Sequence, residues 1–276
     1  MRLYLSMLLL SFTSILWAVE PKKEYVDHPA NSTVKFEALE ITTSDNYKLK
    51  SWICFPTKDK DLKQVLVLAY GDAGNMSYYV RQALEVAKYG YTVVLFDYRG
   101  YGESQAFEMI ETQLYYDEFV TDLKAVVEYS QHRFKQPVGI WALSMGTIAG
   151  TLLYSDVKYD FMIAEGFVSS PQDIISKLKQ YLDKDYTLPN SASQYELALS
   201  KLTLPVLYFA GDRDGLTSPN DSYRAKFLNP KSDVVLYKGA HLQGFQALSD
   251  KTHGERYIKA IDNFLVNKDL PITTTK

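Results

Sequence analysis

The sequence predicts an α/β fold in which a mostly parallel central sheet is covered by helices on both faces. Continuous apolar runs at residues 65–69, 91–96 and 137–143 are typical of strands that are buried on both sides. Segments with helical spacing alternate with these runs, and such alternation favours a parallel sheet between two helical layers. The 276 residues are enough for one large domain with a well-buried core.

The N-terminus has the pattern of a secretory signal peptide over residues 1–18. Met1 and Arg2 form a short basic region, residues 3–17 are mostly apolar, and the small residue Ala18 precedes the first charges. A membrane-spanning helix needs about 20 apolar residues, so no stable span is expected after the signal is removed. The protein is therefore expected to be exported, to a periplasm or out of the cell. The single cysteine, Cys54, cannot form an internal disulfide and is expected to be a buried strand residue.

After the signal, residues 19–33 are expected to be a loose leader into the domain. Residues 34–43 and 48–55 read as two strands, and the turn Ser44-Asp45-Asn46 between them predicts an antiparallel hairpin at one edge of the sheet. The remaining elements alternate. Helices are expected at residues 76–88, 115–131, 145–154, 218–227 and 255–266, and further strands at residues 161–164, 205–209 and 234–237.

One stretch, residues 167–204, separates two predicted strands by nearly forty residues. It holds weak helical patterns at 174–182 and 192–202, split by Leu-Pro-Asn. The stretch is too short for a second domain, so it is interpreted as a short helical lid over the C-terminal ends of the strands. Residues 19–276 are accordingly expected to form a single domain with this insertion.

Ser144 is the candidate nucleophile. It lies between a predicted strand and a predicted helix, with Ala142 two residues before it and Gly146 two residues after it. A nucleophile elbow needs small residues at both places because its sharp turn brings the chain close to neighbouring strands. The backbone N–H of Met145, at the start of the helix, would then point toward the reacting carbonyl oxygen. The motif alone is weak, since a serine at a helix start is also a common N-cap.

An acid and a base follow in the order Ser…Asp…His, which belongs to one of several unrelated folds that carry the same triad. Asp214 comes shortly after the predicted strand at 205–209, with Asp212 as a competitor that is more typical of a turn former. His241 follows the last predicted strand, where a loop histidine can reach a serine near the middle of the sheet. His253, just before the final helix, is the alternative base.

A further candidate is the loop of residues 70–75, Tyr-Gly-Asp-Ala-Gly-Asn, directly after the first buried parallel strand. Its two glycines allow a tight turn that exposes backbone N–H groups. We assign the second donor of an oxyanion hole to the N–H of Asp72, beside that of Met145. An ordinary turn between a strand and a helix remains the competing interpretation of this segment.

With these motifs in place, residues 34–266 resemble the α/β-hydrolase superfamily, and most closely its small serine-aminopeptidase-like or lysophospholipase-like serine hydrolases. The segment of residues 97–104, Asp-Tyr-Arg-Gly-Tyr-Gly-Glu-Ser, is typical of that family, where it braces loops and is not catalytic. The resemblance implies Ser144, Asp214 and His241 as nucleophile, acid and base, and Asp72 and Met145 as oxyanion donors. Two positions depart from the family pattern: Tyr70 replaces a histidine and Ala142 replaces a glycine.

The sequence thus predicts a serine hydrolase that cleaves carboxylic esters, lipid or acyl esters included, through an acyl-enzyme. No metal or organic cofactor is expected. The expected partner is a small-molecule or lipid ester, and the net charge of −3 gives no electrostatic case for nucleic acid. Two alternatives stay open: an acyltransferase, thioesterase or peptidase with the same triad, and a non-catalytic binding protein on this fold. The sequence does not indicate the oligomeric state.

Overall fold

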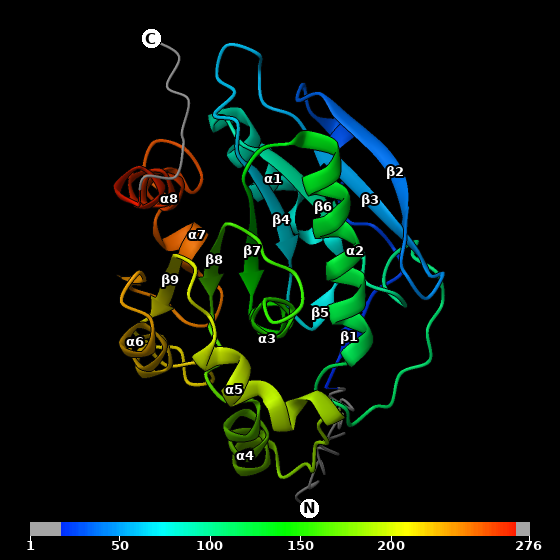
Figure 1. The fold of residues 1–276 in the computed structure, drawn as a ribbon, viewed down its shortest axis with the longest axis vertical. Coiled ribbons are helices and arrows are strands. Elements are labelled where there is room, and N and C mark those ends of the chain that lie inside the picture. Colours follow the sequence, from blue (N-terminus) through cyan, green and yellow to red (C-terminus); the bar gives the residue numbers. More distant parts are fainter. Residues whose placement is uncertain (1–17, 269–276) are drawn as a thin grey trace, which may run out of the picture.

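A single twisted sheet of eight strands forms the centre of the molecule in the computed structural model, which describes residues 18–268 (Figure 1). Its strand order is β10-β9-β8-β7-β4-β6-β3-β2. The antiparallel strands β2 and β3 form one edge, as predicted, and β3 also runs antiparallel to β6. All remaining pairs are parallel. The strands are β2 (Phe36–Thr42), β3 (Lys48–Cys54), β4 (Val65–Ala69), β6 (Thr92–Phe96), β7 (Val138–Leu143), β8 (Phe161–Glu165), β9 (Val206–Gly211) and β10 (Asp233–Tyr237).

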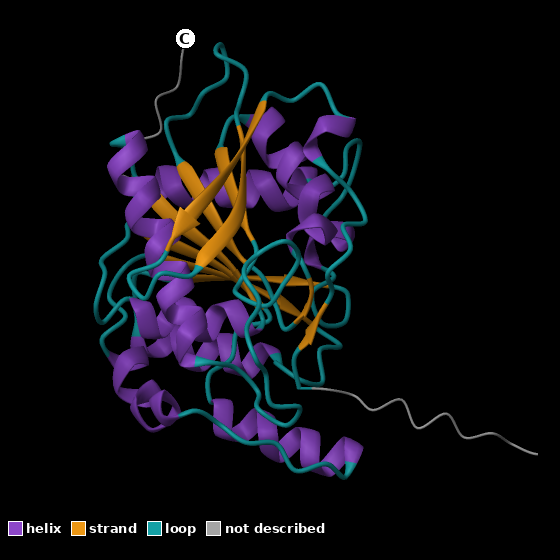
Figure 2. Cartoon of the chain, turned by 90° about the vertical axis from the view of Figure 1, so that its right-hand side faces the viewer, coloured by secondary structure: helices purple, strands orange, loops and turns teal. Residues whose placement is uncertain are grey.

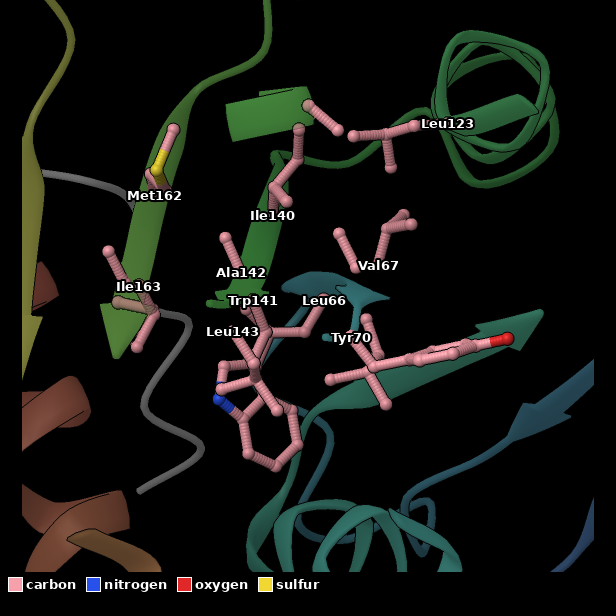
Figure 3. Close-up of a cluster of buried hydrophobic side chains, with 14 of the residues drawn as sticks. Leu66, Val67, Tyr70, Leu123, Ile140, Trp141, Ala142, Leu143, Met162 and Ile163 are labelled. Atoms are coloured by element: carbon pink, nitrogen blue, oxygen red, sulfur yellow. The ribbon is translucent and has the colours of Figure 1, made fainter. Parts of the chain in front are cut away.

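Helices cover both faces of this twisted sheet (Figure 2). Side chains alternate across a strand, so neighbours on β7 reach opposite layers. Ile140 lies toward Leu123 of α2, whereas the Trp141 ring points away from α2 (Figure 3) and donates through Nε1 to the hydroxyl of Tyr257 on α8. The helices are α1 (Val80–Tyr89), α2 (Asp117–Phe134), α3 (Met145–Leu153), α4 (Pro171–Leu182), α5 (Tyr195–Ser200), α6 (Pro219–Leu228), α7 (Gly244–Ala247) and α8 (Glu255–Asn267).

The predicted α/β architecture is therefore confirmed, and most elements begin and end within a few residues of the expected positions. Local chemistry sets several of these ends. The side chain of Ser170 accepts a hydrogen bond from the N–H of Asp173, which caps the start of α4. Helix α1 ends at Gly90, whose φ of 143° is open to glycine but not to residues with a Cβ. The expected helix at 76–88 begins as a 3-10 turn, Met76–Tyr79, before α1.

The insertion between β8 and β9 holds α4, a 3-10 turn (Asn190–Gln194) and α5. Both helical patterns that the sequence suggested for the lid are thus present. In Figure 1, α4 and α5 lie beyond the end of the sheet at which the parallel strands finish. The register places Ala69, Ala142 and Ala164 side by side on β4, β7 and β8. The loops that follow these three strands therefore leave the sheet next to one another.

The prediction of a loose leader over residues 19–33 is wrong. Glu20–Pro21 form a short strand, β1, that pairs in parallel with β5 (Ala73–Gly74). Farther along, the Tyr25 ring contacts Trp52 edge to face at 4.8 Å, and His28 contacts the same ring. Two-residue strands leave no periodic trace in a sequence, which is why the pattern did not reveal them.

The predicted signal peptide lies, except for its last residue, outside the described residues. That last residue, Ala18, is packed into the domain: its N–H donates to the carbonyl of Glu111 at 3.0 Å, and Val19 is also buried. Within residues 18–268, no helix combines the length and the apolar character that crossing a bilayer requires. Cys54 is a free, buried residue of β3, as expected, and burial raises the pKa of its thiol to about 12.

Candidate active site

Ser144 occupies the sharp turn between β7 and α3. Its φ of 49° lies in the left-handed region, which is unusual for a residue with a Cβ and stores local strain. The turn is held because the Ser144 N–H donates to the carbonyl of Glu165 on β8 at 2.9 Å, while Thr147 donates to the carbonyl of Ser144 from both its N–H and its hydroxyl. These bonds fix the direction in which the Ser144 side chain leaves the turn.

The small residues around Ser144 are needed because the elbow packs against β4. A Cβ added to Gly146 would lie 1.8 Å from the carbonyl oxygen of Ala69, a distance that no rearrangement of a side chain can relieve. Ala142, at the other flank, is fully buried between β4 and β8 and keeps both ladders intact. The alanine at this position is thus compatible with the elbow, while the glycine at 146 has no substitute.

We expect Gly146→Ala to lower the free energy of unfolding by about 3 kcal/mol, the upper end for overpacking, because the clash is with backbone. Gly150→Ala in the same helix is the matched control. Its Cβ would meet the flexible end of Met162 at 3.1 Å, and alanine favours a helix by about 1 kcal/mol over glycine. Urea unfolding of both variants measures the difference. Equal stability of the two variants would contradict the packing argument.

His241 links Ser144 to Asp214. Its Nε2 lies 3.0 Å from Ser144 Oγ, and its Nδ1 lies 2.7 Å from Asp214 Oδ2. The side chain of Asp214 is 1% exposed and that of His241 is 28% exposed, so the acid is shielded while the base stays open to a substrate. The three residues come from the ends of β7, β9 and β10, which the sheet brings to one side.

The environment of Asp214 favours its charged form. Burial alone would raise the pKa of this carboxyl, but the hydrogen bond and charge of His241 and two bonds from Thr217 hold it below its usual value. Thr217 donates its N–H to Oδ1 at 2.9 Å and its hydroxyl to Oδ2 at 2.8 Å, and Leu216 donates a third bond. Sequence reasoning missed Thr217, since nothing but its place three residues after the acid marks it.

The two competing residues lie elsewhere. Asp212 accepts a hydrogen bond from the N–H of Gly239 at 3.0 Å and approaches Arg213, so it braces the turn without touching His241. His253 packs on Phe245 and lies 3.4 Å from the hydroxyl of Ser249. Neither reaches Ser144. The structure therefore assembles Ser144, His241 and Asp214 and leaves the alternatives in supporting roles.

A buried acid that the sequence did not reveal, Glu165, supports the loop that carries His241. It is 3% exposed, and its Oε1 accepts bonds from the N–H of Gly244 at 2.6 Å and from the hydroxyl of Tyr237 at 3.1 Å. Burial raises the pKa of Glu165 despite these bonds. Next to it, Gly166 passes so close to the His241 ring that an added Cβ would lie 2.7 Å from Cε1. The position of the imidazole is thus set from the end of β8.

The two expected oxyanion donors lie at the same place. Met145 is the first residue of α3, so its N–H has no partner within the helix. The carbonyl of Asp72 accepts the hydroxyl of Tyr101 at 2.7 Å and the N–H of Glu20 at 2.9 Å, which fixes the backbone on the C-terminal side of this residue. Both residues line the same cavity as Ser144. The two expected donors therefore lie at one cavity with the nucleophile candidate.

The cavity has a volume of about 320 Å³ and is mostly apolar, at the lower end of the range for small-molecule sites. The lid insertion supplies Val168, Ile174, Leu178 and Tyr186 to its wall. The rest of the lining is Ala18, Glu20, Asp72, Ala73, Leu114, Ser144, Met145, Ile148 and Leu216. The nucleophile candidate therefore faces a partly open, mostly apolar space of a size suited to a small acyl group.

The segment of residues 97–104 is scaffold, as the family pattern implied. Arg99 is buried and binds both Asp122 and Asp45, and its guanidinium lies 4.0 Å from the ring centre of Tyr47. Asp97 accepts the hydroxyl of Tyr70 at 3.2 Å and the N–H of Met76 at 2.7 Å. Tyr70, which replaces the histidine of the family pattern, thus anchors from inside the core the start of residues 70–75, the expected oxyanion loop.

Comparison with known proteins supports this architecture. Residues 60–179 match the family model described as serine aminopeptidase, S33. Protein bem46 of Schizosaccharomyces pombe is 25% identical over 271 residues, covering 90% of this chain and 82% of that protein. A probable lysophospholipase L2 of Haemophilus influenzae is 32% identical over 114 residues, which are 40% of this chain and 35% of that protein.

Among solved structures, the Pyrococcus furiosus esterase Pf2001 superposes with a TM-score of 0.71 at 22% identity, covering 90% of this chain and 99% of that chain. XC6422 of Xanthomonas campestris, described as an α/β serine hydrolase without a lid, has a TM-score of 0.61 at 16% identity, with 88% and 97% covered. At these identities the likeness concerns the fold. Together with the sheet order and the elbow, it shows that the chain has the α/β-hydrolase fold.

Proposed function

We propose that the protein is a serine hydrolase that cleaves carboxylic esters through an acyl-enzyme. The observation that carries this proposal is the hydrogen-bonded chain from Ser144 Oγ through His241 to the buried Asp214, placed at an apolar cavity. An activated serine needs a base within hydrogen-bond reach and a third group that orients the base. The two distances at His241 meet both conditions.

The reaction would proceed in two halves. His241 Nε2 takes the proton of Ser144 Oγ as this oxygen bonds to the ester carbonyl carbon, and the carbonyl oxygen becomes an oxyanion near the N–H groups of Asp72 and Met145. The C–O bond to the alcohol breaks, and His241 returns the proton to the departing alkoxide. Water then attacks the acyl-serine with the same base, which releases the acid and restores Ser144.

A fluorophosphonate probe tests whether Ser144 is activated. We expect covalent labelling at Ser144, detected by peptide mass spectrometry, together with turnover in a panel of matched ester, thioester and amide substrates. Addition of an alcohol acceptor separates transfer from hydrolysis, because a transferase yields the transesterified product. Absence of labelling, with no turnover of any panel member, would favour a binding protein on this fold.

We also propose that the protein is exported through the apolar segment at its N-terminus. Expression in a bacterial host, followed by fractionation and mass determination of the N-terminus, is expected to place the protein outside the cytoplasm. The mass also locates the processing site. Cleavage after Ala18 would leave a charged ammonium on Val19 and would remove the hydrogen bond from the Ala18 N–H to the carbonyl of Glu111. Recovery only from the cytoplasm would contradict the proposal.

A further inference from the structure

Residues 18–25, called the strap below, lie along the oxyanion loop. The N–H of Glu20 donates to the carbonyl of Asp72 at 2.9 Å, and the N–H of Lys22 donates to the carbonyl of Gly74 at 2.8 Å. In return, the side-chain amide of Asn75 donates to the carbonyls of Lys22 and Glu24. The strap and the loop thus form one hydrogen-bonded unit beside Ser144.

Both ends of the strap are tied to the domain. At one end the N–H of Ala18 donates to the carbonyl of Glu111. At the other end the hydroxyl of Tyr25 donates to Asp97 Oδ2 at 2.6 Å, and its ring contacts Trp52. A segment fixed at both ends and paired in the middle holds its side chains in defined places, so the direction of Glu20 is set by the fold.

Glu20 lines the cavity that contains Ser144, together with Ala18 and Asp72. The charged residues that follow it in the strap, from Lys22 to Glu24, line a different hollow with Pro21 and Tyr78. Of the charged strap residues, Glu20 is therefore the one that the fold directs to the cavity.

The carboxyl groups of Glu20 and Asp72 both lie at the cavity of Ser144. Burial raises the pKa of Asp72, a hydrogen bond from its own backbone and the charge of the His241 ring lower it, and the charge of Glu20 raises it by a smaller amount. Tyr186, on the lid side of the cavity, has its pKa raised by burial and then by Glu111, Asp72 and Glu20. Three carboxyl groups thus act on one part of an otherwise apolar space.

We infer that Glu20 is a specificity-determining residue that excludes acyl groups with an anionic end from the cavity and admits neutral ones. The inference rests on the proposed ester hydrolysis at Ser144. A carboxylate or phosphate on the acyl chain would enter a low-dielectric space that already holds the charge of Glu20, and like charges brought together there are strongly disfavoured.

Two esters with the same leaving group and the same chain length test the inference: 4-nitrophenyl hexanoate, which is neutral, and mono-4-nitrophenyl adipate, which ends in a carboxylate. We expect wild type to prefer hexanoate in kcat/KM. Glu20→Gln should reduce this preference by about tenfold, the order expected for removal of one like charge. Glu24→Gln, an exposed strap residue, is the matched control and should leave the preference unchanged.

The dependence of the substrate preference on salt separates the effect of the Glu20 charge from a structural effect of the substitution on the strap. Salt screens exclusion by charge, so the preference of wild type should fall as sodium chloride is added, and that of Glu20→Gln should respond less. The N-terminal mass of each preparation is determined, because an ammonium on Val19 would offset the charge of Glu20. An unchanged preference in Glu20→Gln, or an equal change in Glu24→Gln, would overturn the inference while Ser144-dependent hydrolysis stands. Equal hydrolysis of hexanoate by wild type and Ser144→Ala would overturn the proposed function as well.

Discussion

Replacement of Ser144 by alanine is expected to lower kcat on short 4-nitrophenyl esters by about 10⁶-fold, with little change in stability. The variant keeps the elbow backbone and the cavity but removes the atom that would attack the carbonyl. His241 Nε2, 3.0 Å from Ser144 Oγ, would then have no proton to accept. Initial rates with 4-nitrophenyl butyrate, corrected for spontaneous hydrolysis, give the ratio directly.

The same experiment with His241→Ala tests whether the three residues act together as a triad or contribute independently to kcat. Members of a triad act as a unit, so the His241 variant should lose about as much as the Ser144 variant, and the double variant should lose no more than either. His253→Ala is the matched control, because this histidine lies against Phe245, away from Ser144. A result in which the losses multiply, or in which His253→Ala is equally impaired, would refute the assignment of the base.

The fold could be predicted from the sequence because its strands are buried on both faces. Val65–Ala69 is fully buried, so all five residues had to be apolar, and the run marks the strand without any need for alternation. The same holds for β6 and β7. Edge strand β10 is only partly buried along most of its length, and its place in the alternation of strands and helices predicted it.

The candidate site could be predicted for a related reason. Strands that run parallel end on one side of the sheet, so residues just after three different strands meet there even though they are far apart in the chain. Ser144, Asp214 and His241 each follow a strand in this way. A motif of moderate strength at each position is therefore enough to predict the site, because all three positions lie at the same side of the sheet. The choice between Asp214 and Asp212 depended on the turn, and the contacts of both residues resolve it.

Contacts that follow neither a periodic pattern nor a motif could not be predicted from the sequence. The pairing of Glu20 with the oxyanion loop involves two-residue strands, and such strands have no pattern of their own. The hydroxyl of Thr217 acts through its distance to Asp214, and the side chain of Glu165 acts through its burial beneath the His241 loop. The contacts of Glu20 and Glu165 join segments that lie more than fifty residues apart, and the contact of Thr217 depends on how the turn after β9 folds.

Replacement of Asp214 by asparagine is expected to lower kcat by about 10⁴-fold, and the contacts of this residue explain why the loss should be so large. Asp214 Oδ1 accepts the N–H groups of Leu216 and Thr217, so an asparagine would keep its carbonyl oxygen at that place. Its amide nitrogen would then face His241 Nδ1 as a donor. The ring would have to accept at Nδ1 and carry its proton on Nε2, which leaves it unable to take the proton of Ser144.

Thr217→Val is the control for this prediction, since it removes the hydroxyl near His241 Nδ1 but keeps the carboxylate; it should cost far less activity than Asp214→Asn. A loss in Asp214→Asn of tenfold or less would contradict the tautomer argument.

Stability gives an independent check. The folded-state pKa of Asp214 is lowered, so its charged form stabilises the fold at pH values above the unfolded pKa of about 3.9, and this contribution disappears as the pH falls through the folded value. The difference in free energy of unfolding between wild type and Asp214→Asn, measured in urea, should therefore be larger at pH 7 than at pH 3. A difference that grows toward low pH would mean that burial, rather than the bonds from His241 and Thr217, dominates the energetics of this carboxylate.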